Sequence, residues 1–288
     1  MSKLSFSCDY MEGAHPAILR RLTETNMEKT PGYGLDEYSA SAKAKIREAC
    51  RCPEAEIFFL VGGTQTNATV IDAMLCSYQG VMAAESGHVS VHEAGAIEHD
   101  GHKVLPLPQH NGKIKADQIR SLMDDYRNNA THERMVMPGM VYISQPTEFG
   151  TLYSLAELRE ISAVCREYGL ALYVDGARLA MRSCARKTMY PWRILRPAAM
   201  PSISAAPSAV RSSARPWSSR RAARSPTFSR SSSSTARSSP KELGLQFDTL
   251  FTDGLYERIG IPAIQAADRI REALMQNGYT LCFDSPTN

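Results

Sequence analysis

The sequence lacks several features that would place it outside the cytoplasm. It has no run of about 18 apolar residues, the length that a membrane-spanning helix needs. Its start, MSKLSFSCDYMEG, has no apolar core of a secretory signal. The seven cysteines are odd in number and show no spacing typical of a disulfide framework. These absences predict a cytoplasmic protein in a reduced compartment, with no membrane partner.

Acidic residues are absent from Met181–Lys241. This stretch holds 13 Lys and Arg residues, 16 serines and seven prolines, and it also lacks Gly, Asn, Gln and His. The rest of the 288-residue chain carries 20 basic and 30 acidic residues, so the formal charge of +3 combines an acidic scaffold with a basic segment. The length and the 43% hydrophobic content are typical of one large globular unit with a smaller appended lobe.

Outside this segment, helical and strand patterns alternate along the chain. Ser154 and Glu157 form a capping box that predicts a helix ending at Gly169. Further helices are expected at 36–50, 64–77, 115–126 and 263–276. Strands are expected at 57–63, 80–84, 102–107, 140–144, 170–175 and 279–283. The alternation predicts an α/β fold with a mainly parallel sheet and helices on both faces, and ligands bind such sheets beyond the carboxyl ends of the strands.

Two motifs lie at that predicted edge. GGTQTN at 62–67 stands between a strand and a helix, where backbone amides at a helix N-terminus favour phosphate; an ordinary helix cap is the alternative. DGAR at 175–178 closes the strand 170–175. Asp175 could hold a protonated ring nitrogen and Arg178 a substrate carboxylate, although a strand-end ion pair would have the same sequence.

The histidines at 88 and 92 have the spacing of one helix face. No HExxH motif or cysteine pair accompanies them, so the pattern favours a stacking or hydrogen-bonded histidine and no metal site.

Six segments then occur in a recognisable order: SCDYMEGAHP, GYGLDEYS, GGTQTN, GHVSVHEAGAIE, SQPTEFGTLYSLAEL and LYVDGARLA. With them the chain resembles the low-specificity L-threonine aldolase and β-eliminating lyase family, which are pyridoxal 5'-phosphate enzymes of the aspartate aminotransferase fold, fold type I. The resemblance implies a lyase that cleaves L-threonine-type β-hydroxy amino acids to glycine and an aldehyde. A β-eliminating lyase or an aminotransferase on the same scaffold is the alternative.

The resemblance assigns roles to matching positions. Gly63 and Thr64 would bind the cofactor phosphate, and His88 would stack on the pyridine ring. Asp175 would pair with the ring nitrogen, and Arg178 would take the carboxylate of a small amino-acid substrate.

Two more positions, Asp9 and Tyr33, match residues near the substrate or the subunit interface. Family sites are built between subunits, which implies a homodimer or homotetramer.

The sequence departs from the family pattern at two points. The aldolases carry a histidine in the loop after the strand 140–144, where this chain has Thr147 and Glu148, which puts threonine in doubt as the substrate. The Schiff-base lysine is also absent. It is expected roughly 25–35 residues after Asp175 by this resemblance, but Lys187 is the only lysine before Lys241 and lacks the family context. We therefore expect the chain as written to be inactive.

A shifted reading frame would account for both the missing lysine and the basic segment. Synonymous codons for residues 199–218 allow DAFYIGGTKCGALFGEAVV in the shifted frame, and those for 228–242 allow LTIIKQHGALFAKG. The shifted lysine codon, AAG, would straddle Pro207 and Ser208. The alternative is a genuine Arg/Ser-rich segment that binds RNA, but it would interrupt a parallel sheet between adjacent strands.

The chain therefore divides into three predicted parts. Residues 1–180 form the first part of a large pyridoxal-phosphate-binding domain. Residues 181–242 are interpreted as out of frame and irregular. Residues 243–288 hold a bridging helix and the start of a truncated small domain. We expect no nucleic-acid partner on this interpretation.

Overall fold

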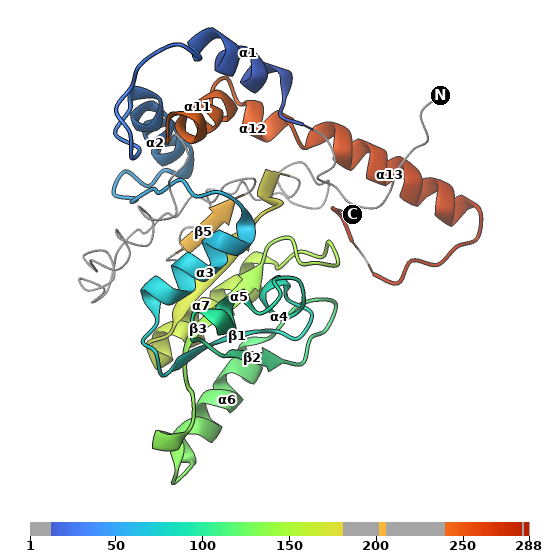
Figure 1. The fold of residues 1–288 in the computed structure, drawn as a ribbon. Coiled ribbons are helices and arrows are strands. Elements are labelled where there is room, and N and C mark those ends of the chain that lie inside the picture. The colour runs from blue at the N-terminus through green and yellow to red at the C-terminus, as the bar shows by residue number, and fades with distance from the viewer. Residues whose placement is uncertain (1–12, 181–201, 206–239, 284, 288) are drawn as a thin grey trace.

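A parallel five-stranded sheet forms the centre of the computed structural model, which describes residues 13–180, 202–205, 240–283 and 285–287. The strands are β1 (Gln79–Ala84), β2 (Val104–Leu107), β3 (Met137–Ser144), β4 (Ala171–Gly176) and β5 (Ser202–Ala205). Their order across the sheet is β2-β1-β3-β4-β5, and every neighbouring pair is parallel (Figure 1). All carboxyl ends therefore meet at one edge.

Helices cover both faces of the sheet. The helices α6 (Ala116–Asn128) and α7 (Leu155–Tyr168) bury their apolar sides on one face, where Ile119, Leu158 and Ile161 are almost fully buried. The other face carries α3 (Gly63–Met74) and the one-turn helices α4 (His88–Val91) and α5 (Ala96–His99). The predicted α/β class with a mainly parallel sheet is confirmed.

Local sequence signals set the ends of α7. The Ser154 hydroxyl accepts a hydrogen bond from the Glu157 amide at 3.2 Å, and Glu157 Oε2 accepts one from the Ser154 amide at 2.6 Å. This reciprocal pair is the predicted capping box. The helix ends at Gly169, whose φ of 71° suits a residue without a Cβ.

A second group of helices lies above the carboxyl edge of the sheet in Figure 1. It consists of α1 (Pro16–Thr25), α2 (Glu37–Cys50), α11 (Pro240–Leu250) and α12 (Leu255–Arg258), and α13 (Ile261–Gln276) extends away from it. The Lys45 ammonium lies 2.6 Å from Asp248 Oδ1 and joins α2 to α11. The helix expected at 263–276 is confirmed as α13.

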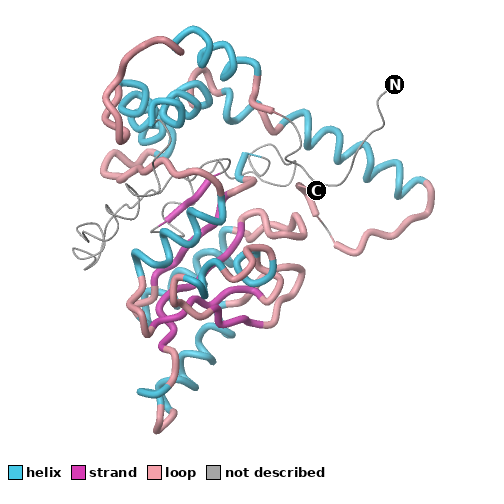
Figure 2. The backbone as a smooth tube through the Cα atoms, in the orientation of Figure 1, coloured by secondary structure: helices cyan, strands magenta, loops and turns pink. Residues whose placement is uncertain are grey.

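Two predicted strands are wrong. Residues 57–63 form no strand, although Glu56 and Phe59 each make a single bridge. The apolar side chain of Ile57 instead packs with Ile46 and Phe247 between α2 and α11, so burial rather than strand pairing explains this run. Residues 279–283 are loop (Figure 2), because no described strand lies beside them to pair with.

The segment expected to be irregular, 181–242, lies mostly outside the described residues. Within it the structure describes β5, which pairs with β4, and the first residues of α11. Among the described residues, no helix combines the length and the apolar character needed to cross a bilayer.

Candidate functional site at the carboxyl edge of the sheet

The N-terminus of α3 presents backbone amides to open space. Gly62, the residue before the helix, has a φ of 81° and makes no side-chain cap. Gly63 and Thr64 are exposed, and a Cβ added to Gly63 would meet no atom within 4 Å. Uncapped amides at the start of a 12-residue helix are the donors that a phosphate needs.

Asp175 is the last residue but one of β4, at the same edge, and is buried, with 7% of its surface exposed. Its Oδ2 accepts hydrogen bonds from the Tyr142 hydroxyl at 2.6 Å and from Asn67 Nδ2 at 3.2 Å. Its Oδ1 accepts one from the Ala177 amide at 2.9 Å. These donors satisfy both oxygens of the carboxylate at this buried position.

His88 follows β1 at the start of α4, and its side chain is about 40% exposed. Nδ1 lies 2.7 Å from Glu93 Oε1, and the backbone amide donates to Glu148 Oε1 at 2.8 Å. The hydrogen bond to Glu93 raises the pKa of His88, against the opposing effect of burial. The charges of Glu93, Asp175 and Glu148 raise it further.

Arg178 and Tyr33 are the remaining described residues of the predicted site. Arg178 lies half-buried in the turn that follows β4. Tyr33 is 76% exposed, with a φ of 62°, in the loop before α2. Asp9, Pro207 and Ser208 fall outside the described residues.

Thr147 and Glu148, the two residues that differ from the family pattern in the loop after β3, both make hydrogen bonds within the protein. Thr147 is buried, and its hydroxyl lies 2.7 Å from that of Thr151. Glu148 Oε1 accepts from Ser144 Oγ at 2.6 Å as well as from the His88 amide. The Glu148 carboxylate therefore ties the end of β3 to the start of α4.

Three important residues had no role in the sequence-based prediction, namely Asn67, Glu93 and Tyr142. Asn67 lies inside the GGTQTN motif, and Glu93 follows the two histidines, so both were in view as parts of motifs. Tyr142 gave no signal, because an apolar strand residue and a hydrogen-bonding one look alike in a buried run.

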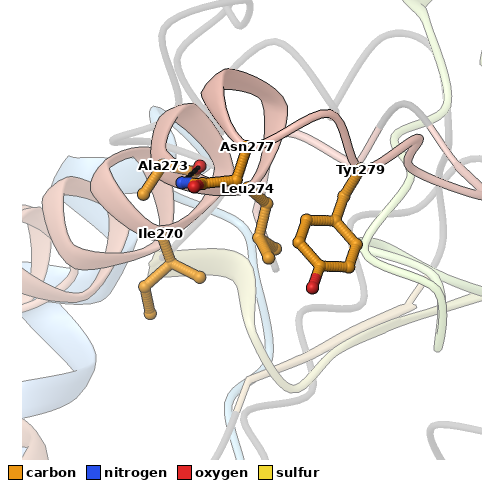
Figure 3. Close-up of a pocket in the computed structure, with 5 residues that line it drawn as sticks. All are labelled: Ile270, Ala273, Leu274, Asn277 and Tyr279. Atoms are coloured by element: carbon orange, nitrogen blue, oxygen red, sulfur yellow. Dashed lines mark hydrogen bonds between the residues drawn. The ribbon is translucent and has the colours of Figure 1, made fainter.

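A hollow of about 440 Å³ lies elsewhere, along α13 (Figure 3). It is lined by Ile270, Ala273, Leu274, Asn277 and Tyr279, and by none of the predicted site residues. Among the described residues no group of three or more His, Cys, Asp and Glu side chains could hold a metal ion.

The described residues include a suitable group for each part of a phosphorylated pyridine, but no lysine that would attach it at this edge. The α3 amides suit its phosphate, the half-exposed His88 ring suits its face, and the buried Asp175 suits its ring nitrogen. The first described lysine after Asp175 is Lys241, whose ammonium donates to the carbonyl oxygens of Thr25, the last residue of α1, and of Glu28 in the loop that follows.

The fold is that of an aspartate-aminotransferase-like α/β protein. Aspartate aminotransferase from Thermus thermophilus superposes with a TM-score of 0.66 at 14% identity, over 94% of this chain and 70% of that one. Within this class, the family model described as beta-eliminating lyase matches residues 6–208. The chain belongs to the β-eliminating lyase family.

Two proteins named as threonine aldolases are similar to this chain. The low specificity L-threonine aldolase of Pseudomonas aeruginosa is 34% identical over 182 residues, which cover 62% of this chain and 51% of the relative. The chain thus matches about half the length of this curated relative. A threonine aldolase from Leishmania major superposes with a TM-score of 0.88 at 32% identity, over 97% of this chain and 81% of that one.

Proposed function

We propose that the intact form of this protein is a pyridoxal-5'-phosphate-dependent lyase that cleaves L-threonine-type β-hydroxy amino acids to glycine and an aldehyde. One observation carries the proposal. The uncapped start of α3, the ring of His88 and the carboxylate of Asp175 lie at one edge of the sheet, and Arg178 follows three residues after Asp175. The threonine aldolase names of the relatives support the choice of substrate class.

When bound, pyridoxal phosphate supplies an electron-accepting ring that stabilises negative charge on the substrate carbon. Asp175 would keep the ring nitrogen protonated, because a buried carboxylate stabilises a positive charge beside it. His88 would cover one ring face, and the amides of Gly63 and Thr64 would bind the phosphate. Arg178 would bind the substrate carboxylate through its planar fork of donors.

The chain as written is proposed to hold the cofactor without a covalent bond and without turnover. A lysine amine at the site would attach the cofactor and move protons, and the sequence offers none in the expected interval. We infer that residues 181–242 are read out of frame, and that the correct frame encodes a Gly-Gly-Thr-Lys turn directly after β5.

Three proteins test this proposal: the chain as written, a frame-corrected chain, and the frame-corrected chain with alanine in place of the lysine of the Gly-Gly-Thr-Lys turn. We expect borohydride to fix pyridoxal phosphate covalently to the frame-corrected protein alone. We also expect that protein alone to release glycine and acetaldehyde from L-threonine. Covalent fixation on a peptide of the uncorrected chain would contradict the proposal.

A second activity, β-elimination or transamination, is favoured by one observation. Glu148 stands beside the position where the aldolases have a histidine, and its carboxylate is already engaged by Ser144 and His88. Product analysis of the frame-corrected protein with L-threonine, L-cysteine and an aromatic amino acid separates the activities. Ammonia and pyruvate from cysteine without acetaldehyde from threonine would assign β-elimination.

Self-association is proposed as well. The loop before α2 exposes Met27, Tyr33 and Leu35, each by more than three quarters of its surface. Three large apolar side chains left exposed in one loop would suit a surface that a second copy covers. Light scattering after gel filtration tests this proposal, and a strictly monomeric frame-corrected protein would overturn it. The proposed setting, a reduced cytoplasm, fits the exposed thiols of Cys76 and Cys282.

A further inference from the structure

A buried series of hydrogen bonds links His88 to Asp175. His88 Nδ1 lies 2.7 Å from Glu93 Oε1, and the same oxygen accepts from Asn67 Nδ2 at 2.6 Å. Asn67 Nδ2 also donates to Asp175 Oδ2 at 3.2 Å. The side chain of Glu93 is 0% exposed, and Asn67 is 1% exposed. The two residues that would face the ring of the cofactor are thus joined through two residues without an assigned role.

The orientation of the Asn67 amide is fixed by its neighbours. Its Oδ1 accepts from the Tyr173 hydroxyl at 2.6 Å, while both protons of Nδ2 point to carboxylates. A flipped amide would place Oδ1 against two carboxylate oxygens, which is unfavourable in a buried site. Asn67 therefore separates the carboxylates of Glu93 and Asp175 with a donor to each.

Glu93 fixes the protonation of His88. A carboxylate only accepts, so the proton of this contact belongs to His88 Nδ1. Nε2 is then the ring nitrogen that changes its protonation state. Around the imidazole stand Glu93, then His92 on the same segment with its ring 5.5 Å away, Glu148 from the loop after β3, and Asp175 from β4. Glu93 Oε2 is buried and has no hydrogen-bond partner among the described residues.

We propose that Glu93 and Asn67 are positioning residues that hold His88 and Asp175 in one arrangement for the two sides of a pyridine-type cofactor ring. This inference rests on the proposed function. Glu93 sets the tautomer and the plane of the imidazole. Asn67 places the Asp175 carboxylate and keeps the two buried carboxylates from repelling one another.

The first test uses the cofactor-free full chain, so it is independent of cofactor binding. The pKa and the tautomer of His88 are measured by NMR on protein with isotope-labelled histidine, and the signal is assigned from its loss in His88→Asn. Glu93→Gln keeps the shape but removes the charge, so we expect the pKa of His88 to fall. Asn67→Leu removes the donor that competes with His88 Nδ1 for Glu93 Oε1, so we expect the contact between His88 and Glu93 to strengthen and the pKa of His88 to rise.

Glu98→Gln is the matched control, since Glu98 is an exposed carboxylate on α5, beyond the segment that holds His88 and Glu93. It should leave the pKa and the tautomer of His88 unchanged. An unchanged titration of His88 in a natively folded Glu93→Gln protein would overturn the proposal, as would a fall of this pKa in Asn67→Leu. If Glu93→Gln does not fold, Glu93→Asp serves, because it withdraws the carboxylate from Nδ1 by one methylene.

The second test measures non-covalent binding of pyridoxal 5'-phosphate by equilibrium dialysis. We expect Glu93→Gln and Asn67→Leu to weaken binding about tenfold, as the loss of one charge-assisted hydrogen bond does. Glu98→Gln should bind like the parent chain. Equal binding by all three variants would overturn the positioning role. A parent chain that binds no cofactor, together with the expected titrations of His88, would refute the proposed function and leave the linkage through Glu93 and Asn67 supported.

Discussion

Ser204 of β5 stands directly opposite Asp175 of β4 in the parallel ladder. Asp175 lies one residue before the end of β4 at the carboxyl edge of the sheet, and the parallel β5 ends at the same edge. Pro207 comes two residues after the end of β5 at Ala205. A lysine encoded across Pro207 and Ser208 would thus follow closely, in sequence, the strand that pairs with the one carrying Asp175.

The coding DNA should therefore contain AAG out of frame across the codons of Pro207 and Ser208. Sequencing of genomic DNA and of the transcript measures this directly. Any other triplet at that place would remove the frame-shift explanation. In that case the Arg/Ser-rich segment would be genuine, and RNA binding that weakens steeply with salt would be the next property to measure.

Tyr142→Phe should weaken cofactor binding by removing a donor from Asp175. Burial raises the pKa of Tyr142 well above its usual value, and the charge of Asp175 raises it further, so the hydroxyl stays protonated at neutral pH. Losing this buried bond to a charged group costs about 1.5–3 kcal/mol, or roughly ten- to a hundredfold in affinity. Equilibrium dialysis against pyridoxal phosphate gives the measurement. Tyr168→Phe is the control, since it removes a tyrosine–aspartate bond between α7 and α6.

Ser154→Ala should destabilise α7 by removing its N-cap. We expect a cost of about 1 kcal/mol, which lowers the melting temperature by roughly 2–4 °C in a protein of this size. Thermal unfolding followed by circular dichroism measures the shift. Ser154→Asp keeps an acceptor for the Glu157 amide and should unfold near the parent temperature. A Ser154→Ala protein as stable as the parent would show that the cap contributes nothing.

Glu157 adds a pH dependence to the same helix start. Burial alone would raise the pKa of Glu157, but hydrogen bonds from Lys113 and Ser154 outweigh burial and lower it. Because the folded state has the lower pKa, this stabilisation is present above the usual carboxyl range and is lost as the pH falls through the folded value. Glu157→Gln should therefore reduce the melting temperature at pH 7 and change it little at pH 3. An equal reduction at both values would exclude the charge as the cause.

Gly244→Ala should disrupt the packing of α11 on α2. A Cβ at this position would lie 2.6 Å from the backbone nitrogen of Ser39, and backbone cannot yield as a flexible side chain can. Overpacking of this kind costs about 1–3 kcal/mol. Gly32→Ala is the control, since its Cβ would meet no atom within 4 Å. Urea unfolding of both variants measures the cost, and equal midpoints would contradict the close approach of the two helices.

The sequence predicts those features that are recorded in neighbouring residues. Ser154, Glu157 and Gly169 specify the ends of α7 by local hydrogen bonding and backbone conformation, and the structure places all three as expected. The same reasoning failed at residues 57–63. The side chain of Ile57 packs against Phe247, which is remote in the sequence, and no local pattern distinguishes that contact from pairing in a sheet.

The candidate site also divides into residues that local motifs reveal and residues that only distant contacts reveal. His88 and Asp175 could be named because they occur in motifs whose order resembles a known family. Asn67 and Glu93 could not be given roles, because their contacts join segments 26 and 108 residues apart. Only the folded chain brings the segment after α4 and the carboxyl end of β4 close enough to α3 for the Asn67 amide to bridge two carboxylates.

The contact between Lys45 and Asp248 has a consequence for synthesis of the protein, since 203 positions separate the two residues. At about 5–20 residues per second, a ribosome needs on the order of 10–40 s to cover this interval. During that time Ile46 and Ile57 lack Phe247, the residue that completes their apolar cluster. The nascent chain therefore exposes these apolar side chains until α11, the helix that covers them, has been synthesised. We expect this interval to be when chaperones bind it.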